Sequence, residues 1–288
     1  MTETIIGVDL GGTKVSVGAV TEGTASRVVR REVPSQEAQD VVLAEIMNAI
    51  DEVFDRSVVG IGCGVPSVVD VAEGIVFDVE NIPSWKEVPL GAALEECFGV
   101  PVSINNDANA FAVGEHVFGS GREFTDLVGL TLGTGMGTGV IINGRLYSGA
   151  NCGAGEIGMM AHKGMTLEAF CSGPFFQREY GAAGDEIYRR ARDGDTGALA
   201  AFERFGTELS EAVMIALYAY DPQAVIFGGS ISAAFDLFKA GLRRGLEQFA
   251  YPHVIERLVI APSSLENAAV LGSAALYVDA SRGHSADS

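Results

Sequence analysis

Short apolar runs, separated by turn residues, alternate with helical patterns in the first 120 residues. Two of these runs are joined through Gly11-Gly12, which predicts a β-hairpin. Apolar residues recur with helical spacing after Pro34-Ser35 and again after Pro89. The expected order is strands at 4–9, 15–20 and 28–33, a helix at about 38–54, a strand at 58–65, a helix at 90–98, a strand at 100–104 and a helix at 108–118.

A similar order begins again after residue 125. The second series is three strands at about 126–132, 137–142 and 145–148, then helices, a strand at 224–227, a helix from Ser232, a strand at 258–260 and a last helix at about 268–276. Each series opens with a glycine-containing hairpin, at Gly11-Gly12 and at 133–139. The chain therefore resembles a structural duplication of an α/β unit, although its halves share little residue identity.

Composition and charge indicate which partners and which cellular location the protein is expected to have. The chain is 48% hydrophobic and 20% charged, lacks an apolar run of the roughly 18 residues that span a bilayer, and begins without the pattern of a signal peptide. We therefore expect a cytoplasmic protein. A formal net charge of −19 disfavours nucleic acid or an anionic membrane as partner. The four cysteines lack the paired spacing of a disulfide framework or zinc knuckle, and the polar residues 281–288 are expected to be disordered.

The glycine-rich stretch at 132–139 is the first candidate for chemistry. Glycine at alternate positions lets the backbone approach a ligand closely, and its N–H groups, with the hydroxyls of Thr134 and Thr138, suit phosphate oxygens. A hairpin that binds nothing is the alternative. Asp9, just before the first glycine turn, could hold Mg²⁺ through water, or could simply hydrogen-bond the turn.

Asp107 is the second carboxylate of interest. It follows a predicted parallel strand, at the sheet edge where α/β folds bind their ligands. An Asp that accepts a proton from an attacking hydroxyl is a recurring part of phosphoryl transfer, whereas ordinary helix capping would explain an Asp here without catalysis. Asn105 and Asn106 offer the donors and acceptors that recognise a polyol.

Several motifs, in this order, resemble the ROK family of sugar kinases and repressors. They are Asp9-Leu10-Gly11-Gly12-Thr13-Lys14, Asn106-Asp107-Ala108-Asn109-Ala110, the loop 132–139, Gly155-Glu156-Ile157-Gly158 and Gly228-Gly229-Ser230. The resemblance implies an α/β fold of two duplicated actin-like ATPase (ribonuclease H-like) domains with an active-site cleft between them. The smaller domain would comprise 1–108 plus about 267–280, and the larger one 109–266.

The resemblance also implies roles for individual residues. Asp107 would be the general base that deprotonates a sugar hydroxyl, and Asp9 would lie near Mg²⁺. The sugar would be held by Asn81, Asn106, Asp107, Glu156 and Glu168. The nucleotide and its phosphates would be bound by Asp9, Gly11, Gly12, Thr13, Lys14, Gly133, Thr134, Gly135, Gly228 and Gly229.

One segment departs from the family. Met159 stands where most members have a histidine that serves both sugar and zinc, and the accompanying cysteine cluster is missing. We therefore expect no zinc site. His162 could replace the missing histidine, but we expect it to be a surface residue on a short loop.

The resulting hypothesis is an ATP- and Mg²⁺-dependent kinase that phosphorylates a hexose or hexose derivative, at O6, in the manner of a glucokinase. A sugar-binding regulatory protein without catalysis is one alternative, and a kinase that uses polyphosphate as donor is another. The family resemblance further implies a homodimer.

Overall fold

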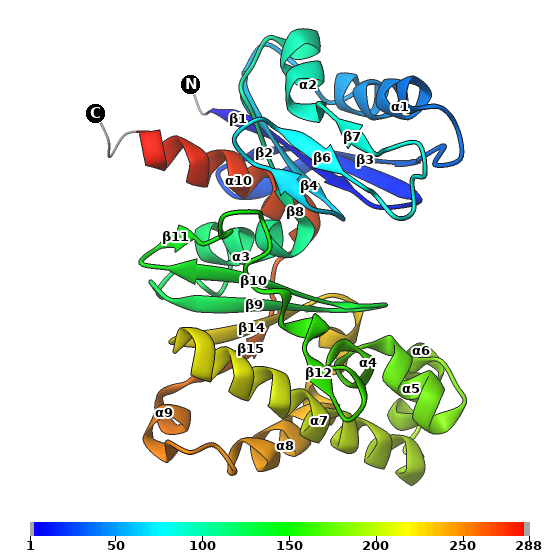
Figure 1. The fold of residues 1–288 in the computed structure, drawn as a ribbon, viewed down its shortest axis with the longest axis vertical. Coiled ribbons are helices and arrows are strands. Elements are labelled where there is room, and N and C mark those ends of the chain that lie inside the picture. The colour runs from blue at the N-terminus through cyan, green and yellow to red at the C-terminus, as the bar shows by residue number, and fades with distance from the viewer. Residues whose placement is uncertain (1–2, 285–288) are drawn as a thin grey trace.

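The structure, a computed structural model, describes residues 3–284 and is built on two five-stranded sheets that lie one above the other (Figure 1). The first sheet has the order β3-β2-β1-β4-β8. Its strands are β1 (Thr4–Leu10), β2 (Lys14–Thr21), β3 (Thr24–Glu32), β4 (Val58–Val65) and β8 (Val102–Asn106). β1 pairs antiparallel with β2 and parallel with β4, and β4 pairs parallel with β8.

The second sheet repeats this plan in the order β11-β10-β9-β14-β15. Its strands are β9 (Leu127–Leu132), β10 (Met136–Ile142), β11 (Arg145–Leu146), β14 (Ala224–Gly228) and β15 (Val259–Pro262). β9 pairs antiparallel with β10 and parallel with β14, and β14 pairs parallel with β15. The shared topology confirms the duplicated α/β architecture that the sequence predicted.

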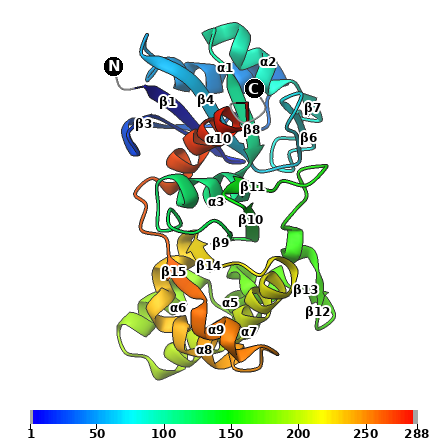
Figure 2. The same cartoon turned by 90° about the vertical axis from the view of Figure 1, so that its left-hand side faces the viewer.

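Two helices, α3 (Asp107–Val117) and α10 (Ala268–His284), fill the space between the sheets (Figures 1 and 2). α10 packs directly on the first sheet, because an added Cβ at Gly62 of β4 would lie 1.8 Å from the carbonyl oxygen of Ser273. α3 packs on the second sheet in the same way, at Gly139 of β10. The two helices meet at Gly114 and Gly272, where a Cβ on Gly114 would lie 2.6 Å from the Gly272 Cα. Glycine is required at each of these contacts because backbone meets backbone.

The remaining helices lie beyond the two sheets, on the sides away from α3 and α10 (Figure 1). They are α1 (Gln39–Asp51), α2 (Leu90–Phe98), α4 (Glu168–Cys171), α5 (Gly173–Tyr180), α6 (Gly184–Arg192), α7 (Thr196–Tyr220), α8 (Phe235–Leu246) and α9 (Pro252–Arg257), with 3₁₀ turns η1 (Glu156–Met159) and η2 (Ser230–Ala234). Each sheet has its own large core: one contains Ile6, Ile46 and Trp85, and the other contains Leu130, Phe205 and Phe238.

Some elements differ from the sequence prediction. β8 begins and ends two residues later than expected, so Asn105 and Asn106 belong to the strand. Two small sheets were not predicted. One consists of β5 (Val69–Asp70), β6 (Ile75–Phe77) and β7 (Glu87–Val88), and the other of β12 (Ala161–His162) and β13 (Met165–Thr166).

The two ends of the described chain bear on two further expectations. α10 continues through His284, so the first four residues of the predicted disordered tail are helical, and 285–288 lie outside the described residues. None of the helices within residues 3–284 combines the length and the apolar character needed to cross a bilayer.

Candidate active site

Asp107 is the first residue of α3, directly after the end of β8. The helix N-cap is Asn106, whose side-chain oxygen accepts the N–H of Ala108 at 2.8 Å. Asp107 accepts the same N–H with one carboxylate oxygen, also at 2.8 Å. The main capping role therefore falls to Asn106, and the second Asp107 oxygen remains available for a ligand.

Four carboxylates influence one another across this region. Burial raises the pKa of Asp9 to about 6, and the negative charge of Asp107 contributes in the same direction. Burial raises the pKa of Asp107 as well, with a smaller lowering by the Ala108 N–H and a further rise from the charge of Glu156. The pKa of Glu156 is raised by burial and by Glu168. The structure thus links four carboxylates that are far apart in the sequence as a series of neighbouring pairs: Asp9 with Asp107, Asp107 with Glu156, and Glu156 with Glu168.

A buried amide network lies behind Asp107. Asn109 donates to the Asn105 side-chain oxygen at 2.8 Å, and the Asn105 amide donates to Ser148 Oγ at 3.1 Å. The Cys152 thiol donates to the same Asn105 oxygen at 3.1 Å. The loop 147–155, which leads to Glu156, is therefore tied to the strand end and helix that carry Asp107. Asn105 is buried here, so its expected contact with a polyol gives way to a role in this network.

The predicted phosphate loop is the turn between β9 and β10. The N–H of Gly133 donates to the Gly135 carbonyl at 2.9 Å, and the Gly133 carbonyl accepts the N–H of Gly173 at 2.8 Å. Glu168 accepts the backbone N–H of Met136 at 2.8 Å, and a Cβ on Gly135 would lie 2.6 Å from that carboxylate oxygen. A residue expected to bind sugar therefore touches the loop expected to bind phosphate.

The other glycine turn, between β1 and β2, is closed by the Gly11 N–H, which donates to the Lys14 carbonyl at 2.8 Å. Asn81 packs on it so closely that a Cβ on Gly12 would lie 2.3 Å from the Asn81 Cβ. The side chains of Thr13 and Lys14 are exposed. The structure thus joins Asn81 to the turn and leaves the hydroxyl and the ammonium group free.

A cavity of about 770 Å³ opens beside the phosphate loop. Gly133 and Thr134 form one wall, and Ser230, directly after Gly228-Gly229, forms another. Gly229 has a φ of +77°, and a Cβ there would lie 2.3 Å from the Leu132 carbonyl oxygen, so this turn fits only with glycine. Apolar groups of Phe176, Tyr188, Phe202, Ile231 and Ala234 line the interior. The chemistry of these walls suits a flat aromatic base and its ribose.

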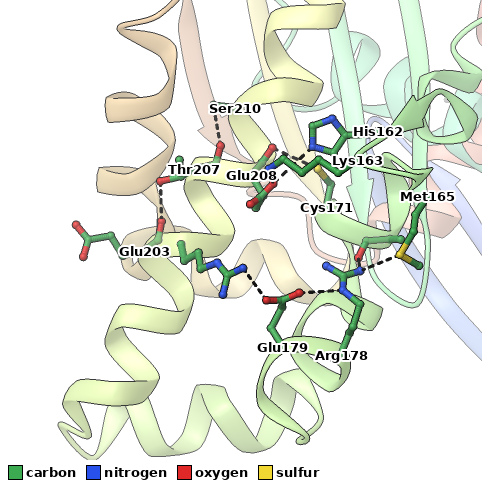
Figure 3. A network of polar contacts seen from close by, with 12 residues as sticks. His162, Lys163, Met165, Cys171, Arg178, Glu179, Glu203, Thr207, Glu208 and Ser210 are labelled. Atoms are coloured by element: carbon green, nitrogen blue, oxygen red, sulfur yellow. Dashed lines mark hydrogen bonds and ion pairs between the residues drawn. The ribbon is translucent and has the colours of Figure 1, made fainter.

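The segment without the family histidine has its own arrangement. Met159 is 63% exposed, and His162 is not the surface residue that we expected. The side chain of His162 is 17% exposed and packs edge-on against Phe170, with the ring centres 5.0 Å apart. It also lies 3.6 Å from the Glu208 carboxylate (Figure 3). His162 is thus engaged with α4 and α7.

Between residues 3 and 284 there is no group of three or more histidine, cysteine or carboxylate side chains arranged to hold a metal ion. Asp9 nevertheless fits a hydrated Mg²⁺, because it is a half-buried carboxylate beside the negative charge of Asp107, and a cation would offset the repulsion between the two. The expectation that the protein lacks zinc stays a prediction.

Comparison with known proteins decides the family. The model of the ROK family matches residues 5–280. The chain belongs to the ROK family. It is 34% identical to a glucokinase from Thermotoga maritima over 94% of this chain and 96% of the relative, and 28% identical to the xylose repressor of Bacillus subtilis over 95% of this chain and 77% of that protein.

A solved structure shows the same fold. The structure of a ROK family glucokinase from Streptomyces griseus, in complex with glucose and AMPPNP, is 28% identical and has a TM-score of 0.79, covering 95% of this chain and 98% of that one. The ROK fold and the two-domain α/β architecture expected from the sequence are therefore confirmed.

Sequence reasoning missed several residues of the site. Asn109 and Cys152 belong to the buried network, and Arg178, Tyr188 and Phe202 line the cavity. The spacing of Asn105 and Asn109, four residues apart across a strand–helix junction, was the one available indication. The cavity residues lie on helices whose packing against the loop 133–135 is not encoded in any local pattern.

Proposed function

We propose that this ROK protein is an ATP-dependent kinase that phosphorylates a hexose or hexose derivative, with Asp107 as general base. The observation that carries the proposal is the hydrogen bond from the Met136 N–H to Glu168. It connects the phosphate loop to Glu168, whose charge acts on Glu156, which in turn acts on Asp107. Phosphoryl transfer requires that a donor site and an acceptor site meet in this way.

In the proposed reaction, Asp107 accepts the proton of the sugar hydroxyl at O6. The oxygen forms a bond to the γ-phosphorus as the bond from that phosphorus to the bridging oxygen of ADP breaks. A raised pKa suits this role, since a general base works best when its pKa approaches the working pH. Asp9 would hold hydrated Mg²⁺, which neutralises phosphate charge when bound, while Thr13 and the loop 133–135 hold phosphate oxygens.

The cavity beside the phosphate loop favours a nucleotide as donor. Polyphosphate is uniformly anionic and would leave the apolar walls of Tyr188, Phe202 and Ile231 empty, whereas a nucleoside buries apolar surface there. The net charge of −19 also disfavours a long polyanion. The Streptomyces griseus relative binds AMPPNP, which supports the same assignment.

The acceptor site supports a sugar with several adjacent hydroxyl groups. Glu156 and Glu168 supply carboxylate acceptors, and the Asn106 amide lies at the same strand end. Glucose is the first candidate, because the relatives at 34% and 28% identity are a glucokinase and a glucose complex. Met159 offers no hydrogen-bond donor, so discrimination among hexoses rests on fewer polar contacts here.

A regulatory protein without catalysis is the second candidate, and the 28% identity with the xylose repressor motivates it. The chain nevertheless keeps the four carboxylates Asp9, Asp107, Glu156 and Glu168 and the phosphate loop, which favours the kinase.

A coupled assay of ADP release over a panel of hexoses, amino sugars and glycosides tests the proposal, with ATP and polyphosphate as alternative donors. If the protein is a kinase, we expect turnover with ATP, and we expect Asp107→Ala to abolish it. Sugar binding by calorimetry without turnover across the panel would instead support the regulatory protein.

A further inference from the structure

Arg178, on α5, lies at the boundary between the nucleotide cavity and the segment that carries Glu168. It is one of the residues that line the cavity, and its side chain is 27% exposed. It is also the only arginine or lysine among the lining residues that the structure gives for this cavity. A ligand that fills the cavity would therefore lie against Arg178 and shield it from water.

Two contacts join Arg178 to the residues that directly follow Glu168. Its guanidinium donates to the Ala169 carbonyl at 2.6 Å, and it lies over the Phe170 ring at 4.1 Å from the ring centre. Both interactions belong to types that are strengthened when the pair is shielded from water. Filling the cavity would supply that shielding.

The other contacts of Phe170 involve the β12–β13 hairpin, which lies between Glu156 and Glu168 in the chain. Figure 3 shows His162, Lys163 and Met165 of this hairpin near α7 and Arg178. His162 packs against the edge of the Phe170 ring, and Lys163 lies 5.4 Å from its centre. Lys163 also pairs with Glu208 of α7 at 2.6 Å. Arg178 therefore reaches this hairpin in two ways: through the Phe170 ring, and directly through the sulfur of Met165 in β13, 4.0 Å from its guanidinium.

We propose that Arg178 is a positioning residue that couples nucleotide binding to the setting of Glu168, an inference that rests on the proposed kinase function. Arg178 is already held by the Ala169 carbonyl, the Phe170 ring and Glu179, but its side chain is partly exposed, so water weakens these contacts. A nucleotide that shields Arg178 strengthens its hold on Ala169 and Phe170 and restricts their motion, so Glu168 reaches its position before the sugar arrives. The sugar then binds with a smaller entropic cost, which is positive coupling between the two ligands.

Hydrogen–deuterium exchange of the segment 161–170, with and without Mg²⁺ and AMPPNP, tests the coupling without requiring that the sugar be known. In the wild-type protein, nucleotide should slow exchange in this segment about fivefold or more, the lower end of typical coupling factors. In Arg178→Met the same saturating AMPPNP should leave the segment's exchange unchanged. Arg178→Lys keeps the charge and one donor, so it should recover part of the effect.

Arg204→Met is the matched control. Arg204 pairs with Glu179, which is also a partner of Arg178, and lies 5.8 Å from the centre of the Phe175 ring. It is not among the residues that line the cavity. Arg204→Met should show the same slowing of exchange by nucleotide as the wild-type protein. If only the Arg178 variants lose this slowing, the cause cannot be the loss of an arginine that pairs with Glu179.

The outcomes separate the coupling from the kinase function. Two results would overturn the coupling alone. One is that AMPPNP slows the exchange of the segment 161–170 equally in the wild-type protein and in Arg178→Met. The other is that AMPPNP binds the wild-type protein without slowing this exchange. If Arg178→Met does not fold, the Lys variant decides by the same comparison. Full wild-type slowing in Arg178→Lys would then overturn the role of the guanidinium. Failure of AMPPNP to bind the wild-type protein would overturn both proposals.

Discussion

At the scale of single residues, Asp107 and Asp9 are two carboxylates with raised pKa values and different proposed tasks. For Asp107→Asn we expect kcat to fall by about 10²- to 10⁴-fold, the usual contribution of a general base, because an amide cannot accept the hydroxyl proton. Nucleotide affinity should change little. Steady-state kinetics with ATP and glucose measures the loss, and Asp40→Asn, an exposed carboxylate in the first turn of α1, is the control. Unreduced kcat in Asp107→Asn would remove the residue from the role of base.

The raised pKa of Asp9 predicts that the stability of the fold depends on pH. Its pKa is raised from 3.8 to about 6 on folding, so the folded protein binds more protons than the unfolded chain between those values. The free energy of unfolding should therefore fall as the pH rises from about 4 to about 6, and the deficit should persist above pH 6.

Asp9→Asn removes this ionisation. The variant should be more stable than the wild-type protein at pH 7, by at most about 3 kcal/mol for two pKa units, and the gain should vanish near pH 4. Its activity with Mg²⁺ and ATP should nevertheless fall. Urea unfolding at several pH values, together with kinetics, tests both. A variant that is less stable than the wild type at pH 7 would contradict the proposed burial of an uncompensated charge.

At the scale of elements, the packing of α10 on β4 should be intolerant of added volume. Gly62→Ala would place a methyl group 1.8 Å from a backbone oxygen of α10, so strand or helix must shift. We expect a loss of at least about 2 kcal/mol in the free energy of unfolding, measured with urea. Gly153→Ala, where a Cβ would meet only the Asn151 carbonyl oxygen at 4.0 Å, should be nearly neutral. Equal stability of the two variants would mean that α10 adapts without cost.

The elements also show how far the sequence could predict this structure. Long apolar segments such as α1 and β4 were predicted well. α1 buries one face, which gives its apolar residues helical spacing, and β4 is buried along almost its whole length, which gives a continuous apolar run. The two-residue strands β12 and β13 were missed, since so short a strand has no measurable period and depends on its contacts with α4 and α7. For the same reason the engagement of His162 with Glu208 could not be foreseen.

The candidate site was predicted unevenly. Asp9, Asp107, Glu156 and Glu168 were identified from motifs, but their mutual charge effects arise from the interdomain arrangement. The bond of Glu168 to Met136 joins residues 32 positions apart, a distance over which no local pattern carries information.

At the scale of the whole molecule, the net charge of −19 should make stability depend on salt. Like charges repel one another in the compact state, and added salt screens them. The melting temperature should therefore rise, by several degrees between about 0.05 and 0.5 M NaCl, in a thermal scan at pH 7.5. Constant or falling values would show that local ion pairs, which salt weakens, outweigh the repulsion. The homodimer expected from the family stays a prediction.

The most direct test of the central claim is ³¹P NMR of the protein incubated with Mg²⁺, ATP and glucose. Our account predicts a new resonance of a phosphate monoester at the sugar O6, formed in equal amount with ADP, and its absence with Asp107→Asn. A panel of other hexoses extends the test if glucose is not the acceptor. Absence of any sugar phosphate across that panel, from a protein that calorimetry shows to bind both ATP and sugar, would contradict the account.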